Sequence, residues 1–233
     1  MSFLALRLLL LAVVAIYVAA AGGKMYDSDH WQYSTKLTTS NFDEVIKENV
    51  DAGRTIFVRW IASEGWGWWV KQAPAWNHAI RSFAANTDVR FGDINLSKDQ
   101  IRGNHNPGAG GWPTIKYFNK KTGYDGAPYI QKTKSAICDE LGDFGNMEAY
   151  VMDAGDTSLC NIETKKSCSE KEMNYSEEWS VKASEEVASQ LDRLAKTNTG
   201  KMKAPLAQWF RQRVGVLKQI SKRYSQTDSS QEL

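Results

Sequence analysis

The alternation of apolar and polar positions divides the chain into a mixed first part and a helical second part. Three runs rich in β-branched and aromatic residues are typical of buried strands: residues 54–62 ("RTIFVRWIA"), 89–95 ("VRFGDIN") and 112–119 ("WPTIKYFN"). Helices are predicted between and after them, mainly from apolar side chains three and four residues apart, in the stretches 35–50 (after a short strand), 70–85, 97–101 and 137–154. This alternation predicts an α/β domain with a central sheet, at residues 32–156.

Beyond Cys168, glycine almost vanishes and the share of charged residues rises. Two runs have apolar side chains at helical spacing: Trp179, Ala183, Val187, Leu191, Leu194 and, after the break "TNTGK", Leu206, Phe210, Val214, Leu217, Ile220. The first run is acidic and the second basic, so an antiparallel pair would set opposite charges against each other. We predict a linker at 157–170, a helical hairpin at 171–226 and a polar tail at 227–233.

Charge and terminal segments indicate the compartment. The formal net charge of +2 over 233 residues offers no bulk reason to expect a nucleic-acid partner. The apolar run 8–21 is short for a membrane span and typical of a signal peptide, so we expect residues 1–21 to be removed after Ala21; the alternative is an uncleaved anchor. No other run is apolar enough to span a bilayer, so no membrane contact is expected after cleavage.

The chain ends on Glu232-Leu233, as retention signals of the endoplasmic reticulum (ER) do, although Ser230 and Gln231 depart from them. We therefore expect residence in the ER lumen; an arbitrary polar tail, with secretion, is the alternative. Two sequons, at Asn95 and Asn174, are possible N-glycosylation sites.

Three cysteines are present. A disulfide between Cys160 and Cys168 would close a short polar loop and stabilise the fold by roughly 2–3 kcal/mol in the chain-entropy model. Pairing of Cys138 with Cys160 is the alternative, and Cys138 is otherwise a candidate free thiol. The histidines, His30, His78 and His105, fall in separate segments without metal-ligand spacing, so neither a metal nor a cofactor is predicted.

Successive stretches of the first part resemble landmarks of a protein disulfide isomerase thioredoxin domain: "LTTSNFDEVI", "TIFVRWIA", "KQAPAW", "FGDIN" and "GGWPTIKYFN". The resemblance implies a thioredoxin fold, a central mixed sheet flanked by helices. In that family a buried strand leads into a Cys-Gly-His-Cys box, and Ala-Pro-x-Trp follows on the same helix. Here Ala73, Pro74 and Trp76 set the register, which places the box at residues 66–69.

The residues at those positions are Trp66, Gly67, Trp68 and Trp69, so only the glycine of the box remains, and no register recovers a cysteine. Pro113, after Trp112, stands where the family has its cis-proline. Thiol–disulfide exchange needs an attacking thiolate and a resolving thiol, which indole cannot replace. The resemblance therefore implies a redox-inactive domain.

The tryptophan loop has two interpretations: its indoles pack on the domain, or they form with Trp112 and Pro113 an exposed platform that binds unfolded or partner polypeptides. The second predicts a non-catalytic isomerase-like protein that assists folding in the ER lumen. The helical part resembles that of redox-inactive ER chaperones and would support a second contact or a homodimer. Two alternatives stay open, a weak oxidoreductase or isomerase that uses Cys138 and an inert subunit of a larger assembly.

Overall fold

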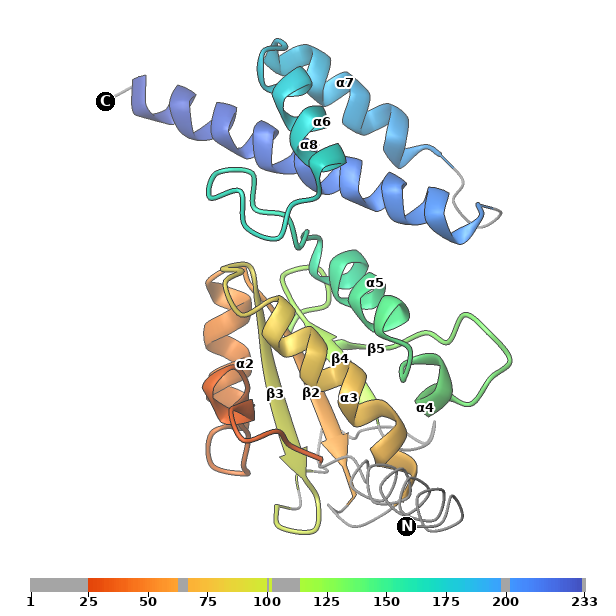
Figure 1. The fold of residues 1–233 in the computed structure, drawn as a ribbon. Helices are drawn as coiled ribbons and strands as arrows, with labels where there is room; N and C mark the ends of the chain where they lie inside the picture. Colours follow the sequence, from red (N-terminus) through yellow and green to blue (C-terminus); the bar gives the residue numbers. More distant parts are fainter. Residues whose placement is uncertain (1–24, 63–66, 100, 102–113, 198–201, 232–233) are drawn as a thin grey trace, which may run out of the picture. The chain divides into compact units, whose positions relative to one another are not determined.

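The computed structural model describes residues 25–62, 67–99, 101, 114–197 and 202–231 (Figure 1). The chain forms two compact units. The first, which we call the sheet unit, comprises residues 1–84 and 90–147, and the second, the helical unit, comprises residues 85–89 and 148–233. The expected signal segment, residues 1–21, and the terminal Glu232-Leu233 lie outside the described residues.

The sheet unit is built on five strands in the order β1-β3-β2-β4-β5. Their bounds are β1 Thr35–Lys36, β2 Thr55–Ile61, β3 Val89–Asn95, β4 Thr114–Phe118 and β5 Ala127–Pro128. Strand β1 runs parallel to β3, whereas β4 is antiparallel to both of its neighbours, β2 and β5. With helices against it, this mixed sheet confirms the expected thioredoxin-type α/β fold.

Strand β2 lies in the middle of the sheet, and all seven of its residues are buried. Its even-numbered side chains join a core with α2 (Phe42–Asp51): Trp60 lies 5.7 Å from Phe42, ring centre to ring centre. The odd-numbered Phe57 stacks on Phe91, which also contacts Trp76 of α3 (Gly67–Ser82). Since successive strand residues face opposite sides, α2 and α3 cover different faces, and Arg59 belongs to the α3 face.

The end of the sheet unit differs from the pattern-based prediction. The helix expected within 137–154 is two helices, α4 (Ile137–Glu140) and α5 (Phe144–Gly155). Gly142 lies between them, where a Cβ atom would come within 2.7 Å of the Cys138 carbonyl oxygen and 2.9 Å of the Lys71 carbonyl oxygen. The glycine therefore permits the close approach of this turn to α3, and the turn at residues 141–142 separates the two helices.

Two shorter elements also differ from the prediction. Residues 96–98 form a turn instead of the start of a helix, because the backbone N–H and the hydroxyl of Ser97 both donate to Oδ1 of Asn95. Strand β5 was not predicted at all, since a two-residue strand that contains Pro128 has no alternation to detect.

Beyond α5, most of which belongs to the helical unit, the described residues of this unit form three helices where the sequence predicted a two-helix hairpin. They are α6 (Glu170–Ser180), α7 (Ser184–Ala195) and α8 (Ala204–Gln231). The stretch from Trp179 to Leu194 is not one helix, because Ala183 has an extended conformation (φ −63°, ψ 153°) and precedes a new helix. Both α6 and α7 contact α8. Their shared core includes Val187, Leu194, Phe210, Val216, Leu217 and Ile220.

A disulfide and a helix cap stabilise the segment that leads into α6. Cys160 and Cys168 form a disulfide with a Cα–Cα distance of 4.2 Å, which is the pairing that the short spacing favoured. Ser169 then begins α6 with a capping box. Its hydroxyl accepts a hydrogen bond from the backbone N–H of Glu172, and the Glu172 carboxylate accepts one from the backbone N–H of Ser169. The sequon at Asn174 lies within α6, and its Ser176 is buried.

Candidate functional site

The site that the sequence predicts is only partly within the described residues. Trp66, Trp112 and Pro113 lie outside them. Gly67 is the first residue of α3, and Trp68 and Trp69 follow in its first turn, with side chains that the structure does not describe. What is described is the framework around the loop.

That framework places the end of β2 beside the start of β4 at one end of the sheet. Strand β2 ends at Ile61, shortly before the tryptophan loop, and β4 begins at Thr114, directly after Pro113. Trp60 and Thr114 are paired across the two strands. The chain therefore leaves β2 and enters β4 at neighbouring positions on the same sheet end.

A buried polar cluster lies on the α3 face of the sheet, centred on Asp93 of β3. Oδ1 of Asp93 accepts a hydrogen bond from Nε of Arg59 at 2.7 Å. Oδ2 accepts from Nε2 of His30 at 2.7 Å and from the hydroxyl of Ser34 at 2.6 Å, and Nε1 of Trp76 lies 3.2 Å away. One carboxylate thus joins the segment before the sheet, strand β2 and helix α3.

These donors set the protonation state of the carboxylate. Burial acts to raise the pKa of Asp93, but the charge of Arg59 and the hydrogen bonds from His30 and Ser34 hold this pKa well below its usual range. A carboxylate of this kind is a weak general base. We therefore assign the cluster a positioning role and no acid–base step.

Only one of the three guanidinium nitrogens of Arg59, Nε, is hydrogen-bonded to Asp93 in the described part of the chain. The guanidinium carbon lies 5.1 Å from the centre of the Trp76 ring and 5.7 Å from that of the Tyr26 ring, within cation–π range. In the described part of the chain, its two terminal nitrogens are buried and have no hydrogen-bond partner. The charge is therefore compensated by Asp93 and by two aromatic rings.

His30 fastens the segment that precedes the sheet. It lies in the short 3-10 helix η1 (His30–Gln32), and its side chain is fully buried. While Nε2 contacts Asp93, Nδ1 lies 3.0 Å from Oδ1 of Asn77 on α3. The side-chain amide nitrogen of Asn77, Nδ2, in turn donates to the backbone carbonyl oxygen of Met25 at 3.4 Å. Residues 25–34 are consequently tied to the sheet and to α3.

Sequence reasoning missed this cluster. The usable signal was a charged residue inside each of two otherwise apolar runs, Arg59 in "TIFVRWI" and Asp93 in "VRFGDIN". Two opposite charges in buried neighbouring strands are tolerated only when they pair. His30 gave no comparable signal, because its partners are far away in the sequence.

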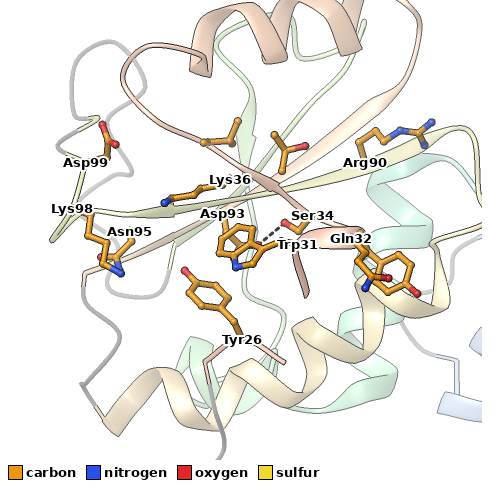
Figure 2. A pocket seen from close by; sticks show the side chains of 13 residues that line it. Tyr26, Trp31, Gln32, Ser34, Lys36, Arg90, Asp93, Asn95, Lys98 and Asp99 are labelled. Atoms are coloured by element: carbon orange, nitrogen blue, oxygen red, sulfur yellow. Dashed lines mark hydrogen bonds between the residues drawn. The ribbon is translucent and has the colours of Figure 1, made fainter. Parts of the chain in front are cut away.

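A groove with a volume of about 870 Å³ lies next to the cluster. Residues 31–37 and Tyr26 line it, and β3 and the turn after it contribute Arg90, Asn95 and residues 98–99. Figure 2 shows Tyr26 and Trp31 in its middle. The hydrogen bond between Ser34 and Asp93 lies at its base, so the groove and the buried cluster share two residues.

The remaining candidates from the sequence are dispersed. Cys138 is 3% exposed, in α4. Asn95 ends β3, while Asn174 and the disulfide belong to the helical unit. Within the described ranges, no group of three or more His, Cys, Asp or Glu side chains is arranged to hold a metal ion, and no described helix is long and apolar enough to cross a membrane.

Comparison with known proteins gives one match in sequence and one in structure. The chain is 25% identical over 166 residues to "Protein disulfide-isomerase-like protein EhSep2" of Emiliania huxleyi, a match that covers 69% of this chain and 66% of that protein, just under two thirds of its length. Among solved structures it is similar to the J-Trx1 fragment of ERdj5, with a TM-score of 0.40, 20% identity and coverage of 57% of this chain and 56% of that one. No family model matches the sequence. The chain is thus similar in sequence to a protein disulfide isomerase-like protein.

Proposed function

We propose that this chain is a non-catalytic, protein disulfide isomerase-like protein of the ER lumen that binds unfolded or partner polypeptides and assists protein folding. Its binding site would be the tryptophan loop, residues 66–69, together with Trp112 and Pro113. The similarity to a protein named as disulfide-isomerase-like supports the general class. That the chain is non-catalytic, that it binds clients and that it resides in the ER lumen are further parts of our proposal.

One observation carries the proposal. Helix α3 begins with Gly67, Trp68 and Trp69, where a dithiol box would need cysteine. A helix N-terminus lowers the pKa of a thiol placed there, but these side chains have no thiol to activate. This supports the interpretation of the loop as the scaffold of an exchange site without its reacting group, and we infer that such a scaffold keeps the capacity to bind.

The disulfide supports an oxidising compartment. Cys160 and Cys168 are joined in the helical unit, and disulfides of this kind persist in the secretory pathway and are rare in the cytosol. This agrees with the apolar run at residues 8–21, which predicts a signal peptide.

The rival enzyme would use Cys138 as a one-thiol site. Its thiol is buried, whereas reactive cysteines are accessible and lie near positive charge. Lys71 is close by, but its ammonium group pairs with Asp139 at 2.9 Å. Burial therefore disfavours this rival. The third hypothesis is that the chain is an inert subunit of a larger assembly. This hypothesis predicts one stable partner and no affinity for unfolded chains.

Binding to a reduced, alkylated protein that stays unfolded tests the proposal. We expect measurable binding by isothermal titration and a change in tryptophan fluorescence. A triple variant, Trp66→Ala, Trp68→Ala and Trp69→Ala, should weaken binding at least tenfold, since large aromatic residues dominate binding energy.

A matched control is Tyr124→Ala, which removes an exposed aromatic ring from the turn after β4. It should bind like the unsubstituted protein. No binding of the unfolded chain by either method, with the protein folded, would overturn the proposal. Binding that the triple variant retains in full would move the site away from the loop.

A further inference from the structure

The groove beside the Asp93 cluster carries two kinds of side chain that favour a ligand. Trp31 is 44% exposed and Tyr33 38% exposed, and both line it. The ring of Trp31 lies 4.8 Å from that of Tyr26, centre to centre. Exposed aromatic side chains gathered at a concave surface are typical of binding sites.

The charge of the groove is predominantly positive. Three basic side chains line it, Lys36, Arg90 and Lys98, against one carboxylate near the surface, Asp99. In Figure 2, Lys36, Lys98 and Asp99 lie toward one end and Arg90 toward the other, with Trp31 and Tyr26 between them. A ligand that spans the groove therefore meets positive charge at both ends.

Both acidic residues of the lining are already held by the protein. Asp93 is buried and bound by Arg59, His30 and Ser34. Oδ1 of Asp99 accepts hydrogen bonds from the backbone N–H of Thr39, at 2.8 Å, and from its hydroxyl. Asp99 keeps its negative charge and interacts with Lys36, but the lining still has three basic side chains against this one surface carboxylate.

The aromatic side of the groove is fixed before any ligand arrives. Trp31 lies within η1 and Tyr33 directly follows it, and His30 of the same short helix is buried and bound to Asp93 and Asn77. The ring of His30 also contacts the Trp31 ring edge-on, at 4.8 Å between centres. A surface that is ordered in advance loses less entropy on binding. The buried cluster should therefore strengthen ligand binding in the groove as well as stabilise the fold.

We propose that this groove is a second binding site, which takes an extended, acidic polypeptide segment. Glutamate or aspartate side chains would contact Lys36 and Lys98 at one end and Arg90 at the other, and an apolar side chain between them would pack on Trp31 and Tyr26. The volume is within the range of ligand pockets, roughly 300–1,000 Å³, and suits a few residues of an extended chain. The proposal rests on the proposed function only for the class of ligand, because it uses none of the loop residues.

Fluorescence anisotropy with a labelled synthetic peptide tests the site. The probe is a ten-residue peptide of alternating glutamate and leucine, and its counterpart carries lysine in place of glutamate. We expect the acidic peptide to bind, its affinity to fall as salt is added, and the basic peptide to bind at least tenfold more weakly. The double variant Lys36→Glu and Lys98→Glu should weaken binding of the acidic peptide at least tenfold, because like charges then face each other.

A control variant reverses two lysines elsewhere on the sheet unit, Lys120→Glu and Lys134→Glu, both of which are exposed. It changes the net charge equally and should leave the affinity within twofold of the original. Trp31→Ala should weaken binding with no change in charge. Circular dichroism of each variant establishes that the fold is retained, and a photoreactive group on the peptide should cross-link to residues 31–37 or 90–99.

Equal binding of the two peptides, no binding of either, or cross-links confined to other segments would overturn the proposal. So would full competition by free glutamate, which would identify a small-anion site instead. The proposed function has separate readouts. If the unfolded protein binds and the acidic peptide does not, the groove proposal alone fails, and if only the acidic peptide binds, the tryptophan loop is not the client site.

Discussion

Nε of Arg59 lies 2.7 Å from Oδ1 of Asp93, and both side chains are buried between the sheet and α3. The pair connects the two central neighbouring strands β2 and β3. Neither charge would be tolerated at such a position alone, since an unpaired buried ion keeps the full cost of leaving water. The two residues are therefore coupled, and substituting one affects the other.

The first prediction concerns this coupling. Asp93→Asn should lower the free energy of unfolding by about 3–5 kcal/mol, because it leaves the Arg59 guanidinium buried without a counter-charge. Urea unfolding followed by circular dichroism measures this. Asp51→Asn is the control: Asp51 pairs with Lys47 on the surface of α2 and accepts a hydrogen bond from the hydroxyl of Tyr124, and its substitution should cost less than about 1 kcal/mol. A cost below about 1 kcal/mol for Asp93→Asn would contradict the assignment, since that is the range of surface pairs.

The second prediction is a pH dependence from Glu140. Burial acts to raise the pKa of this carboxyl, but the backbone N–H of Lys132, the hydroxyls of Thr133 and Tyr129 and the backbone N–H of Thr133 lower it to about 2. Because the folded-state pKa lies below the ordinary value of 4.5, the stabilisation is fully present above about pH 4.5 and disappears as the pH falls toward about 2.

Glu140→Gln tests that dependence. The variant should be less stable than the original protein at neutral pH, and the difference in unfolding midpoint should shrink as the pH falls through this window. Glu44→Gln, at an exposed position of α2, serves for comparison. A difference between Glu140→Gln and the original that is constant from pH 7 to the acidic end of the window would contradict the prediction.

The third prediction concerns Cys138. Its burial should make the thiol of the native protein slow to react with a small thiol reagent, and denaturant without reductant should expose it for stoichiometric labelling. Mass mapping identifies the labelled residue. Rapid labelling of native protein at Cys138, together with loss of mixed disulfides in Cys138→Ser, would instead favour the oxidoreductase alternative.

The fourth prediction concerns the disulfide of the helical unit. Replacing both Cys160 and Cys168 by alanine should lower stability by about 2–3 kcal/mol, from the entropy of closing a short loop. Adding reductant to the original protein should have a similar effect, and adding it to the double variant should have none. If reductant changes neither protein, the bond does not contribute to the unfolding equilibrium.

The fifth prediction restores the missing chemistry. Trp66→Cys with Trp69→Cys would create a Cys-x-x-Cys spacing at the start of α3, a helix of 16 residues, where a thiol pKa is lowered. We expect the double variant to gain reduction of a model protein disulfide over the background rate. Each single variant is a control, because one thiol can form a mixed disulfide but cannot resolve it. No gain would mean that the register of the loop, or its accessibility, differs from the assignment.

The sheet was predictable because its strands carry their own signal. The boundaries of β3 agree with the run "VRFGDIN", and those of β2 lie within "RTIFVRWIA". Breaks inside helices were less visible: Gly142 ends α4 through a close approach to α3 that only the tertiary structure reveals. The separation of α6 from α7 depends on the extended backbone of Ala183, a residue that favours helix by itself.

The two candidate binding regions, the tryptophan loop and the groove, also differ in how far the sequence indicates them. The tryptophan loop could be proposed from the sequence because Ala73, Pro74 and Trp76 resemble a known arrangement, and its role as a site stays a prediction. The groove could not, since it joins residues 26–37 with 90–99, and its shape depends on His30 reaching Asp93 across the intervening chain. Contacts of this kind follow from the fold and leave no periodic trace in the sequence.

The outer strands of the sheet have a consequence for assembly. Both β1 and β5 are only two residues long, the carbonyl oxygen of Lys36 accepts from the side-chain amide of Asn41 at 3.1 Å, and Pro128 has no backbone N–H to donate. Short, occupied or proline-bearing edges are poor templates for a strand of another molecule. In the described part of the chain, the two edges of the sheet are therefore poor sites for edge-to-edge pairing between copies.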